Sequence, residues 1–223
     1  MLFLPQNMGK DLAEFVDQND KITEDEKDFQ KISEYINGKI GLNEMEQYKQ
    51  FDQIVEKLNP FKEAIEDQFD VVSCQFALHY FFKDEATLET FCKNVNILLK
   101  KGGHFIGTCF DGSQVNAKFI QSNTARLEGN IDENVVWRID KAYKDYRTFG
   151  SAIDVFVESI GQSRREYLVD FKHLVEILKH KYNIELKTRY SFKTLFDKSR
   201  KMMQDKALKN YSEMNQCFIF QKK

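Results

Sequence analysis

The sequence predicts an α/β domain organised around a parallel β-sheet. A short apolar and β-branched run occupies residues 69–74, and a second apolar run occupies residues 104–110. Between them, residues 84–99 show the apolar spacing of an amphipathic helix. A strand, a helix and a second strand in this order form a right-handed crossover unit of a parallel sheet. Ligands of such sheets bind beyond the carboxyl ends of the strands, so the loop after Cys74 is the first candidate site.

The helix of this crossover has recognisable signals at both ends. Asp84 is a residue type that caps helix N-termini, and Gly102 and Gly103 follow the last apolar position. The apolar positions are three or four residues apart and comprise Leu88, Phe91, Cys92, Val95, Leu98 and Leu99. We therefore expect a helix from Asp84 to Leu99 that ends before the two glycines.

The rest of the chain continues with weaker patterns. Asp111 and Gly112 indicate a turn, and the apolar residues from Leu168 to Leu178 indicate an amphipathic helix. A further helix is expected at residues 114–122, and strands are expected at residues 135–139, 154–157, 184–188 and 217–220. This order favours a doubly wound sheet followed by a meandering end.

The composition narrows the class of protein. The 223 residues suffice for one domain with a sizeable core. Lys and Arg number 33 and Asp and Glu 35, so RNA binding would need a local site rather than a basic excess. The four cysteines are widely spaced, which favours reduced thiols in an intracellular protein and argues against a structural zinc site. No apolar run is long enough for a bilayer span or a signal peptide, so we expect a soluble protein.

The loop after the first strand, residues 73–82, carries most of the candidate chemistry. It places a carboxamide, an imidazole and a phenol, those of Gln75, His79 and Tyr80, at the mouth of a buried strand. Polar groups are costly there unless something binds them. The residues alone leave open the alternative that this loop only packs aromatic rings.

Four segments resemble the mRNA cap guanine-N7 methyltransferases. FDVVSCQFALHYFF and GGHFIGT resemble the family's SCQF-xx-HY and GGxFIGT segments. REYLVDF, which contains Glu166, resembles its PEFLVxF segment, and FLPQNMGKDL resembles FxxADSSKEL. The resemblance runs from Phe3 to Phe220. Residues 14–68 resemble a charged helical insertion in viral versions of the family, as do the CFDG and VESIGQSRREYLV stretches.

The resemblance implies a fold, an activity and a cofactor. We expect residues 1–223 to form a single, partial domain with the Rossmann-like sheet of class I S-adenosylmethionine-dependent methyltransferases. The family transfers a methyl group from S-adenosylmethionine to N7 of the RNA cap guanine. Its pattern places Asn7, Gln75 and Tyr80 at the cofactor, and His79, Glu166 and Phe76 at the cap guanine. The resemblance implies no catalytic acid, base, nucleophile or metal, because the family accelerates the reaction by holding the two substrates in the reactive geometry.

The chain departs from the family pattern at three places. Asn7 stands where the family has Asp, and Asn215 matches the tyrosine of the family's final strand. The family's first strand ends in an acidic, glycine-rich turn, and no DxGxGxG pattern precedes Phe69. We therefore expect the sheet to lack its first strands, which would leave strand edges unpaired and weaken cofactor binding.

Several alternatives remain open from the sequence. Glu166 is also explained as an acid in the first turn of a helix, and Arg164 with Arg165 as a solvated turn or as a contact to the cap triphosphate. The whole chain is alternatively an inactive cap-binding or partner-binding remnant, or a class I methyltransferase for a small molecule.

The resemblance also suggests partners and a location. The implied partners are the capped 5′ end of RNA, an RNA triphosphatase and guanylyltransferase, or a complementary subunit, and no membrane is implied. The expected location is the nucleus for a cellular protein and a viral factory or the cytoplasm for a viral one.

Overall fold

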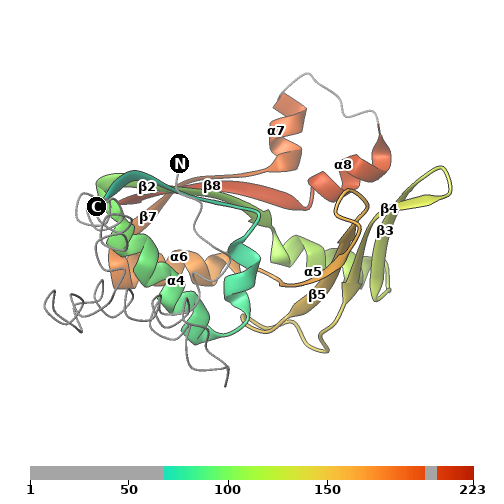
Figure 1. Ribbon diagram of the computed structural model, residues 1–223, viewed down its shortest axis with the longest axis horizontal. Coiled ribbons are helices and arrows are strands. Elements are labelled where there is room, and N and C mark those ends of the chain that lie inside the picture. The colour runs from blue at the N-terminus through green and yellow to red at the C-terminus, as the bar shows by residue number, and fades with distance from the viewer. Residues whose placement is uncertain (1–67, 199–204) are drawn as a thin grey trace, which may run out of the picture. The chain divides into compact units, whose positions relative to one another are not determined.

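The computed structural model describes residues 68–198 and 205–223, which fold around two four-stranded sheets (Figure 1). The predicted insertion at residues 14–68 and the proposed cofactor residue Asn7 lie outside the described residues, apart from Gln68 itself. Both therefore stay predictions.

The first sheet contains the predicted crossover. Its strands have the order β1, β2, β8, β7, with bounds Phe69–Gln75, Leu99–Phe110, Asn215–Lys222 and Ile184–Ser191. Gly103 lies against Asp70 and Gly107 against Cys74, so β1 and β2 advance in the same direction. The predicted parallel pair is thus confirmed. Strand β8 runs antiparallel to both β2 and β7, which brings the end of β7 to the same edge of the sheet as the ends of β1 and β2.

Within the described residues, β1 is an edge strand that pairs with β2 alone. Its side chains alternate between buried Val72 and Cys74 and exposed Val71, Ser73 and Gln75. The strands that we expect to be missing would precede Phe69, outside the described residues.

Helix α4, Glu85–Leu98, begins where the sequence predicts. The Asp84 carboxylate accepts hydrogen bonds from the amide and hydroxyl of Thr87, at 2.8 and 2.7 Å. The expected glycine stop is wrong, because Leu99 is already extended and Gly102 and Gly103 lie inside β2. Gly103 is required there by close packing, since a β-carbon would lie 2.9 Å from the carbonyl oxygen of Lys100.

Helices α4 and α6, the latter Phe171–Tyr182, cover one face of the first sheet (Figure 1). Phe91 of α4 contacts Phe105 of β2, and Phe171 of α6 contacts Phe218 and Phe220 of β8. These ring contacts bury the apolar faces of both helices against the sheet and stabilise this packing.

The second sheet is a fully antiparallel meander that the sequence did not predict as a unit. Its strands β3, β4, β5 and β6 pair in chain order, with bounds Arg126–Ile131, Asn134–Lys141, Ala152–Val157 and Ser163–Tyr167. The placement of Glu166 in the first turn of a helix is wrong, because Glu166 lies in β6. The predicted helix begins only at Phe171, after its cap Asp170, whose carboxylate accepts from the amide of His173 at 3.1 Å.

Helix α5, Gly112–Gln121, lies between the two sheets. The expected turn at Asp111 and Gly112 is in fact the start of this helix, with Asp111 as its cap. Val115 and Phe119 of α5 join Phe110 of β2 to a core with Trp137 and other residues of the second sheet. The two sheets therefore share buried apolar surface. The remaining helices are η2 (Leu78–Phe82), α7 (Phe192–Lys198) and α8 (Lys206–Ser212).

Candidate functional site

The candidate site begins at the carboxyl end of β1, where the chain turns into η2. Phe76 makes this turn in the left-handed region, with φ 50°, which is uncommon for a bulky side chain. Its amide donates to the carbonyl and the hydroxyl oxygen of Thr108 on β2, at 2.9 and 3.1 Å. Leu78 and Phe82 are fully buried and anchor η2. The loop is thereby fixed at the carboxyl edge of the parallel pair.

His79 of η2 and Glu166 of β6 face each other in the interior. The Nδ1 atom of His79 lies 3.4 Å from Oε2 of Glu166, and the side chains are 7% and 13% exposed. Among the described residues, neither His79 Nε2 nor Glu166 Oε2 has a hydrogen-bond partner, although both atoms are buried. Buried polar atoms are nearly always paired, so this arrangement is suited to a ligand that supplies the missing partners.

Burial sets the charge state of this pair. It lowers the pKa of His79 to about 4, so the imidazole is neutral at physiological pH. It raises the pKa of Glu166 to about 7, so the carboxyl group changes its charge near neutrality. The pair therefore presents a neutral imidazole beside a carboxyl group. A ligand with N–H donors would stabilise the ionised form of this carboxyl group.

Tyr80 lies at the mouth of the same site. Its ring centroid is 4.2 Å from that of His79 in an edge-to-face arrangement. Burial raises the pKa of Tyr80, the Glu166 carboxylate raises it further, and the guanidinium of Arg164 lowers it. Tyr80 therefore lies within electrostatic reach of Glu166 and Arg164 of β6.

The other sequence-predicted residues lie beside this pair. Gln75 is exposed at the end of β1, where its Oε1 accepts from the hydroxyl of Thr108 at 2.9 Å and its Nε2 donates to Ser73 at 3.0 Å. Phe76 is 54% exposed and packs its ring edge-to-face against Phe192, with centroids 6.2 Å apart. The structure thus brings together His79, Tyr80 and Glu166, whereas the ring of Phe76 faces α7.

Tyr211 of α8 is a site residue that the sequence did not reveal. Burial and then the charge of Glu166 raise the pKa of this phenol. Its ring contacts those of Phe110 and Trp137, each with centroids 5.5 Å apart. Asn215, which matches the family's tyrosine, instead donates its side-chain amide to the carbonyl of Tyr211 at 3.2 Å. The packing of α8 against Phe110 and Trp137 brings this second tyrosine toward Glu166.

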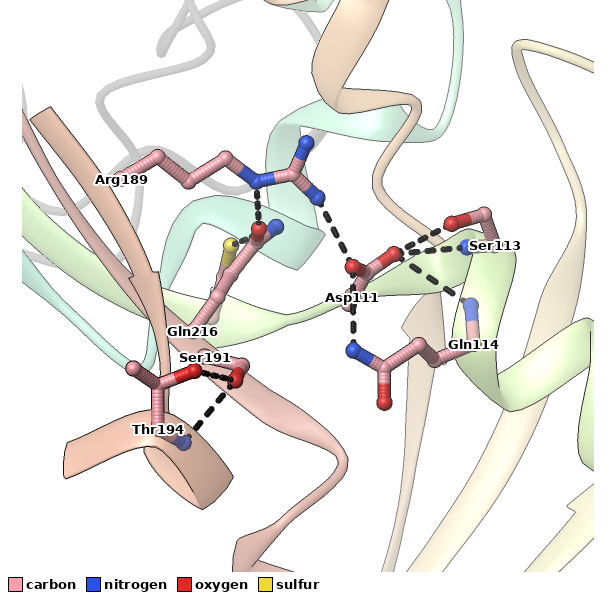
Figure 2. Close-up of polar contacts among 8 residues, drawn as sticks. Asp111, Ser113, Gln114, Arg189, Ser191, Thr194 and Gln216 are labelled. Atoms are coloured by element: carbon pink, nitrogen blue, oxygen red, sulfur yellow. Dashed lines mark hydrogen bonds and ion pairs between the residues drawn. The ribbon is translucent and has the colours of Figure 1, made fainter. Parts of the chain in front are cut away.

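A polar network of the exposed Arg189 with the buried Asp111 and Gln216 holds the neighbouring part of the carboxyl edge together, as Figure 2 shows. Asp111, the cap of α5, accepts from Nη2 of Arg189 on β7 at 2.8 Å. Arg189 also donates its Nε to Gln216 of β8, and its guanidinium lies 4.4 Å from the ring centroid of Phe171. This network ties α5 to β7 and β8. Its members are too far apart in the chain for a motif to reveal them.

No group of three or more potential metal ligands occurs in residues 68–198 and 205–223. No helix in these ranges is long and apolar enough to span a membrane.

The fold and the site define an α/β enzyme-like domain whose polar side chains gather at the carboxyl edge of a parallel strand pair. Its sequence matches the family model of the mRNA (guanine-N(7))-methyltransferase domain over residues 25–218. The chain belongs to this family. The family resemblance and the methyltransferase class of the fold are thereby confirmed, whereas the segment at residues 3–12 lies outside the matched range and stays a prediction.

Individual relatives agree with this assignment. A probable mRNA-capping enzyme of Acanthamoeba polyphaga mimivirus is 31% identical over 177 residues, which cover 71% of this chain and 15% of that protein. The mRNA cap guanine-N(7) methyltransferase of Candida albicans is 31% identical over 136 residues, 57% of this chain and 28% of that protein. The Caenorhabditis elegans enzyme of the same name is 57% identical over 49 residues, which cover 22% of this chain and 13% of that protein. The matches thus span less than a third of the length of these relatives.

Solved structures give weaker likenesses. The CcbJ methyltransferase of Streptomyces caelestis superposes with a TM-score of 0.42 at 16% identity, covering 70% of this chain and 57% of that one. An S-adenosylmethionine-dependent methyltransferase of Clostridium acetobutylicum superposes with a TM-score of 0.41 at 15% identity, covering 78% and 72%.

Proposed function

We propose that this chain acts in the transfer of a methyl group from S-adenosylmethionine to N7 of the guanine that caps RNA. The observation that carries the proposal is the buried pair of His79 and Glu166, with its unpartnered Nε2 and Oε2 atoms. A guanine base has the donors and acceptors that these atoms lack. Family membership supports the same substrate.

Glu166 supplies the selectivity for guanine in this proposal. A carboxylate accepts hydrogen bonds from guanine N1–H and from the amino group at C2 together, whereas adenine presents no such pair of donors. Because Glu166 is 13% exposed, the wrong base would leave its carboxylate desolvated and unpaired. His79 adds a neutral donor or acceptor to the same base.

Methyl transfer to N7 needs no general base, because the lone pair of N7 is available in the neutral base. Catalysis then rests on holding N7 in line with the transferred carbon. The methylated base carries a positive charge, which the Glu166 carboxylate favours. The neutral state of His79 avoids placing a second positive charge beside it.

The described residues fit a methyl donor at the end of β1. Gln75 offers an exposed carboxamide that Thr108 and Ser73 hold in place, and Tyr80 offers a phenol beside His79. S-adenosylmethionine, when bound there, supplies an electrophilic methyl group on a sulfonium. Asn7 is the third proposed contact to this cofactor. An RNA triphosphatase, a guanylyltransferase or a complementary subunit is the proposed protein partner, because capping requires the preceding steps.

The test compares methyl transfer and binding with matched dinucleotides. The 223-residue chain should bind the unmethylated cap analogue GpppG more tightly than ApppA, and radiolabelled S-adenosylmethionine should yield 7-methylguanosine after digestion. Glu166→Gln should abolish the preference for GpppG. The amide replaces one acceptor oxygen of the carboxylate by an NH2 donor, which cannot accept a hydrogen bond from the N–H groups of guanine. Glu158→Gln, on an exposed turn, is the control and should behave like the parent. Equal binding of GpppG and ApppA by the parent chain would refute the proposal.

A further inference from the structure

Arg164 and Arg165 are adjacent in the sequence, but the strand β6 directs them to opposite faces of the second sheet. Successive side chains in a strand point to opposite faces, and directly paired residues of neighbouring strands share a face. Arg165 pairs with Asp154 of β5, whereas Arg164 pairs with Val155 and Glu166 pairs with Ile153. Val155 and Ile153 are buried in the core. Arg164 therefore shares the face of Glu166, and Arg165 does not.

Arg165 is fully engaged on the outer face. Its Nε and Nη2 donate to the two carboxylate oxygens of Asp154, at 2.6 and 2.9 Å. The same row continues to Asp140 of β4, which is paired with Arg126 of β3. The charges of this row neutralise each other across all four strands, so Arg165 has a structural explanation without a ligand.

Arg164 has no comparable partner in the part of the chain that the structure describes. Within the described residues no carboxylate lies within ion-pair distance of it, whereas Arg126, Arg138, Arg165 and Arg189 each have one. Its side chain is exposed, and its charge is felt by Tyr80 at the mouth of the site. The strand thus leads from the buried Glu166 to the exposed guanidinium of Arg164, which has no ion-pair partner in residues 68–198 and 205–223.

We propose that Arg164 binds the triphosphate bridge of the capped substrate and so selects a capped end over a free base. This inference rests on the proposed function. Residues two apart in a strand are separated by about 6.6 Å. A guanine held by Glu166 would direct its ribose and phosphates away from the floor and toward this rim. A guanidinium is well matched to phosphate oxygens, since it donates in a planar fork.

The experiment compares Arg164→Gln with its neighbour Arg165→Gln in the full 223-residue chain. Both variants remove one positive charge from the same strand, so net charge and position are matched. Binding of GpppG, ApppA and guanosine would be measured by calorimetry at several salt concentrations. Arg164→Lys serves as a rescue variant, because it restores the charge without the planar fork.

The expected result is selective for phosphates. Arg164→Gln should weaken GpppG binding by about tenfold, the equivalent of one charge-assisted hydrogen bond, and leave guanosine binding unchanged. The affinity for GpppG should also become less sensitive to salt, because one contact between opposite charges is lost. Arg165→Gln should match the parent in both respects, and Arg164→Lys should recover part of the affinity.

Two results would overturn the inference. One is equal GpppG binding by Arg164→Gln and Arg165→Gln. The other is an equal loss of guanosine binding in Arg164→Gln, which would mean that Arg164 shapes the base pocket. Failure of the proposed function has a different signature, since the parent chain would then bind GpppG and ApppA alike. An equal loss of GpppG and ApppA in Arg164→Gln would still support the phosphate contact.

Discussion

Burial shifts the pKa values of Glu166 and His79, which share one site, in opposite directions. Burial raises the pKa of Glu166 to about 7 and lowers that of His79 to about 4. Protonation of Glu166 therefore occurs first as the pH falls, while His79 stays neutral over the whole interval. At the scale of single residues, the site should respond to pH through Glu166.

Binding of the cap guanine should weaken as the pH falls below about 7. The protonated carboxyl group has lost one of the acceptors that guanine N1–H and the C2 amino group require, and the free protein is protonated with a pKa of about 7. The affinity for GpppG should be measured by titration between pH 5.5 and 8.5. At the acid end of this range, it should decrease by up to about tenfold for each pH unit. The weak binding that Glu166→Gln retains should not follow this profile. A parent profile that is flat across pH 7 would contradict the prediction.

The burial of Glu166 should also cost stability at alkaline pH. Its pKa is raised from 4.5 in the unfolded chain to about 7, so the stability it contributes below pH 4.5 is lost as the pH rises through 7. Glu166→Gln has no charge to bury and should gain on the order of 3 kcal/mol relative to the parent between pH 5 and pH 8. Urea unfolding at these two pH values would measure the difference. If the difference in unfolding free energy between Glu166→Gln and the parent did not change with pH, the folded chain would already stabilise the Glu166 carboxylate.

At the scale of elements, the close approach of β1 and β2 positions the loop that carries His79 and Tyr80. Gly107 of β2 makes this approach possible, since a β-carbon there would lie 2.4 Å from the carbonyl oxygen of Cys74 and 2.4 Å from the ring of Phe218. Both neighbours belong to the packed sheet. Neither is the end of a flexible side chain, so the contact cannot relax cheaply.

Gly107→Ala should destabilise the protein by about 2–3 kcal/mol through overpacking of this strand pair. Lys101→Ala, at an exposed position of the same strand, is the control and should change the unfolding free energy by less than about 0.5 kcal/mol. Denaturant unfolding of the two variants gives the comparison. If Gly107→Ala were as stable as the control, β1 would have to be free to move away from β2.

At the scale of the whole molecule, the described part of the chain should unfold as one unit. Phe110 of the first sheet, Val115 and Phe119 of α5, and Trp137 of the second sheet belong to one buried cluster. Trp137 is the single tryptophan of the chain, and its indole donates to the carbonyl of Ala207 at 2.8 Å. The first sheet and its covering helix contain buried thiols, whose pKa burial raises to about 12 for Cys92 and Cys109.

These probes test whether the two sheets unfold together. We expect Cys92 and Cys109 to become reactive toward a thiol reagent at the same denaturant concentration at which the emission of Trp137 shifts to the red. A Cys217→Ser background would remove the half-buried thiol that complicates the native baseline. Thiol reaction at a clearly lower concentration than the emission change would show that the first sheet opens on its own.

The sequence by itself determined the crossover of β1, α4 and β2, the cap at Asp84 and the loop that carries Gln75, His79 and Tyr80. These features depend on apolar periodicity, on capping and on contiguous motifs, all of which act within a few residues along the chain. The same local signals failed at Gly102 and Gly103, because both lie within β2, where Gly103 packs against Asp70 of β1 and the pairing with β8 begins at His104. Sheet pairing is a long-range effect that no helix-stop signal records.

Only the tertiary structure decided which residues share the candidate site. It placed Glu166 in a strand rather than a helix, brought its carboxylate to His79 across 87 residues of sequence separation, and added Tyr211 from α8. It also separated Arg164 from Arg165, because strand pairing sends one toward the core face and the other toward Asp154. Cross-strand register and the burial of charged groups arise from contacts between distant segments, and a local pattern does not encode them.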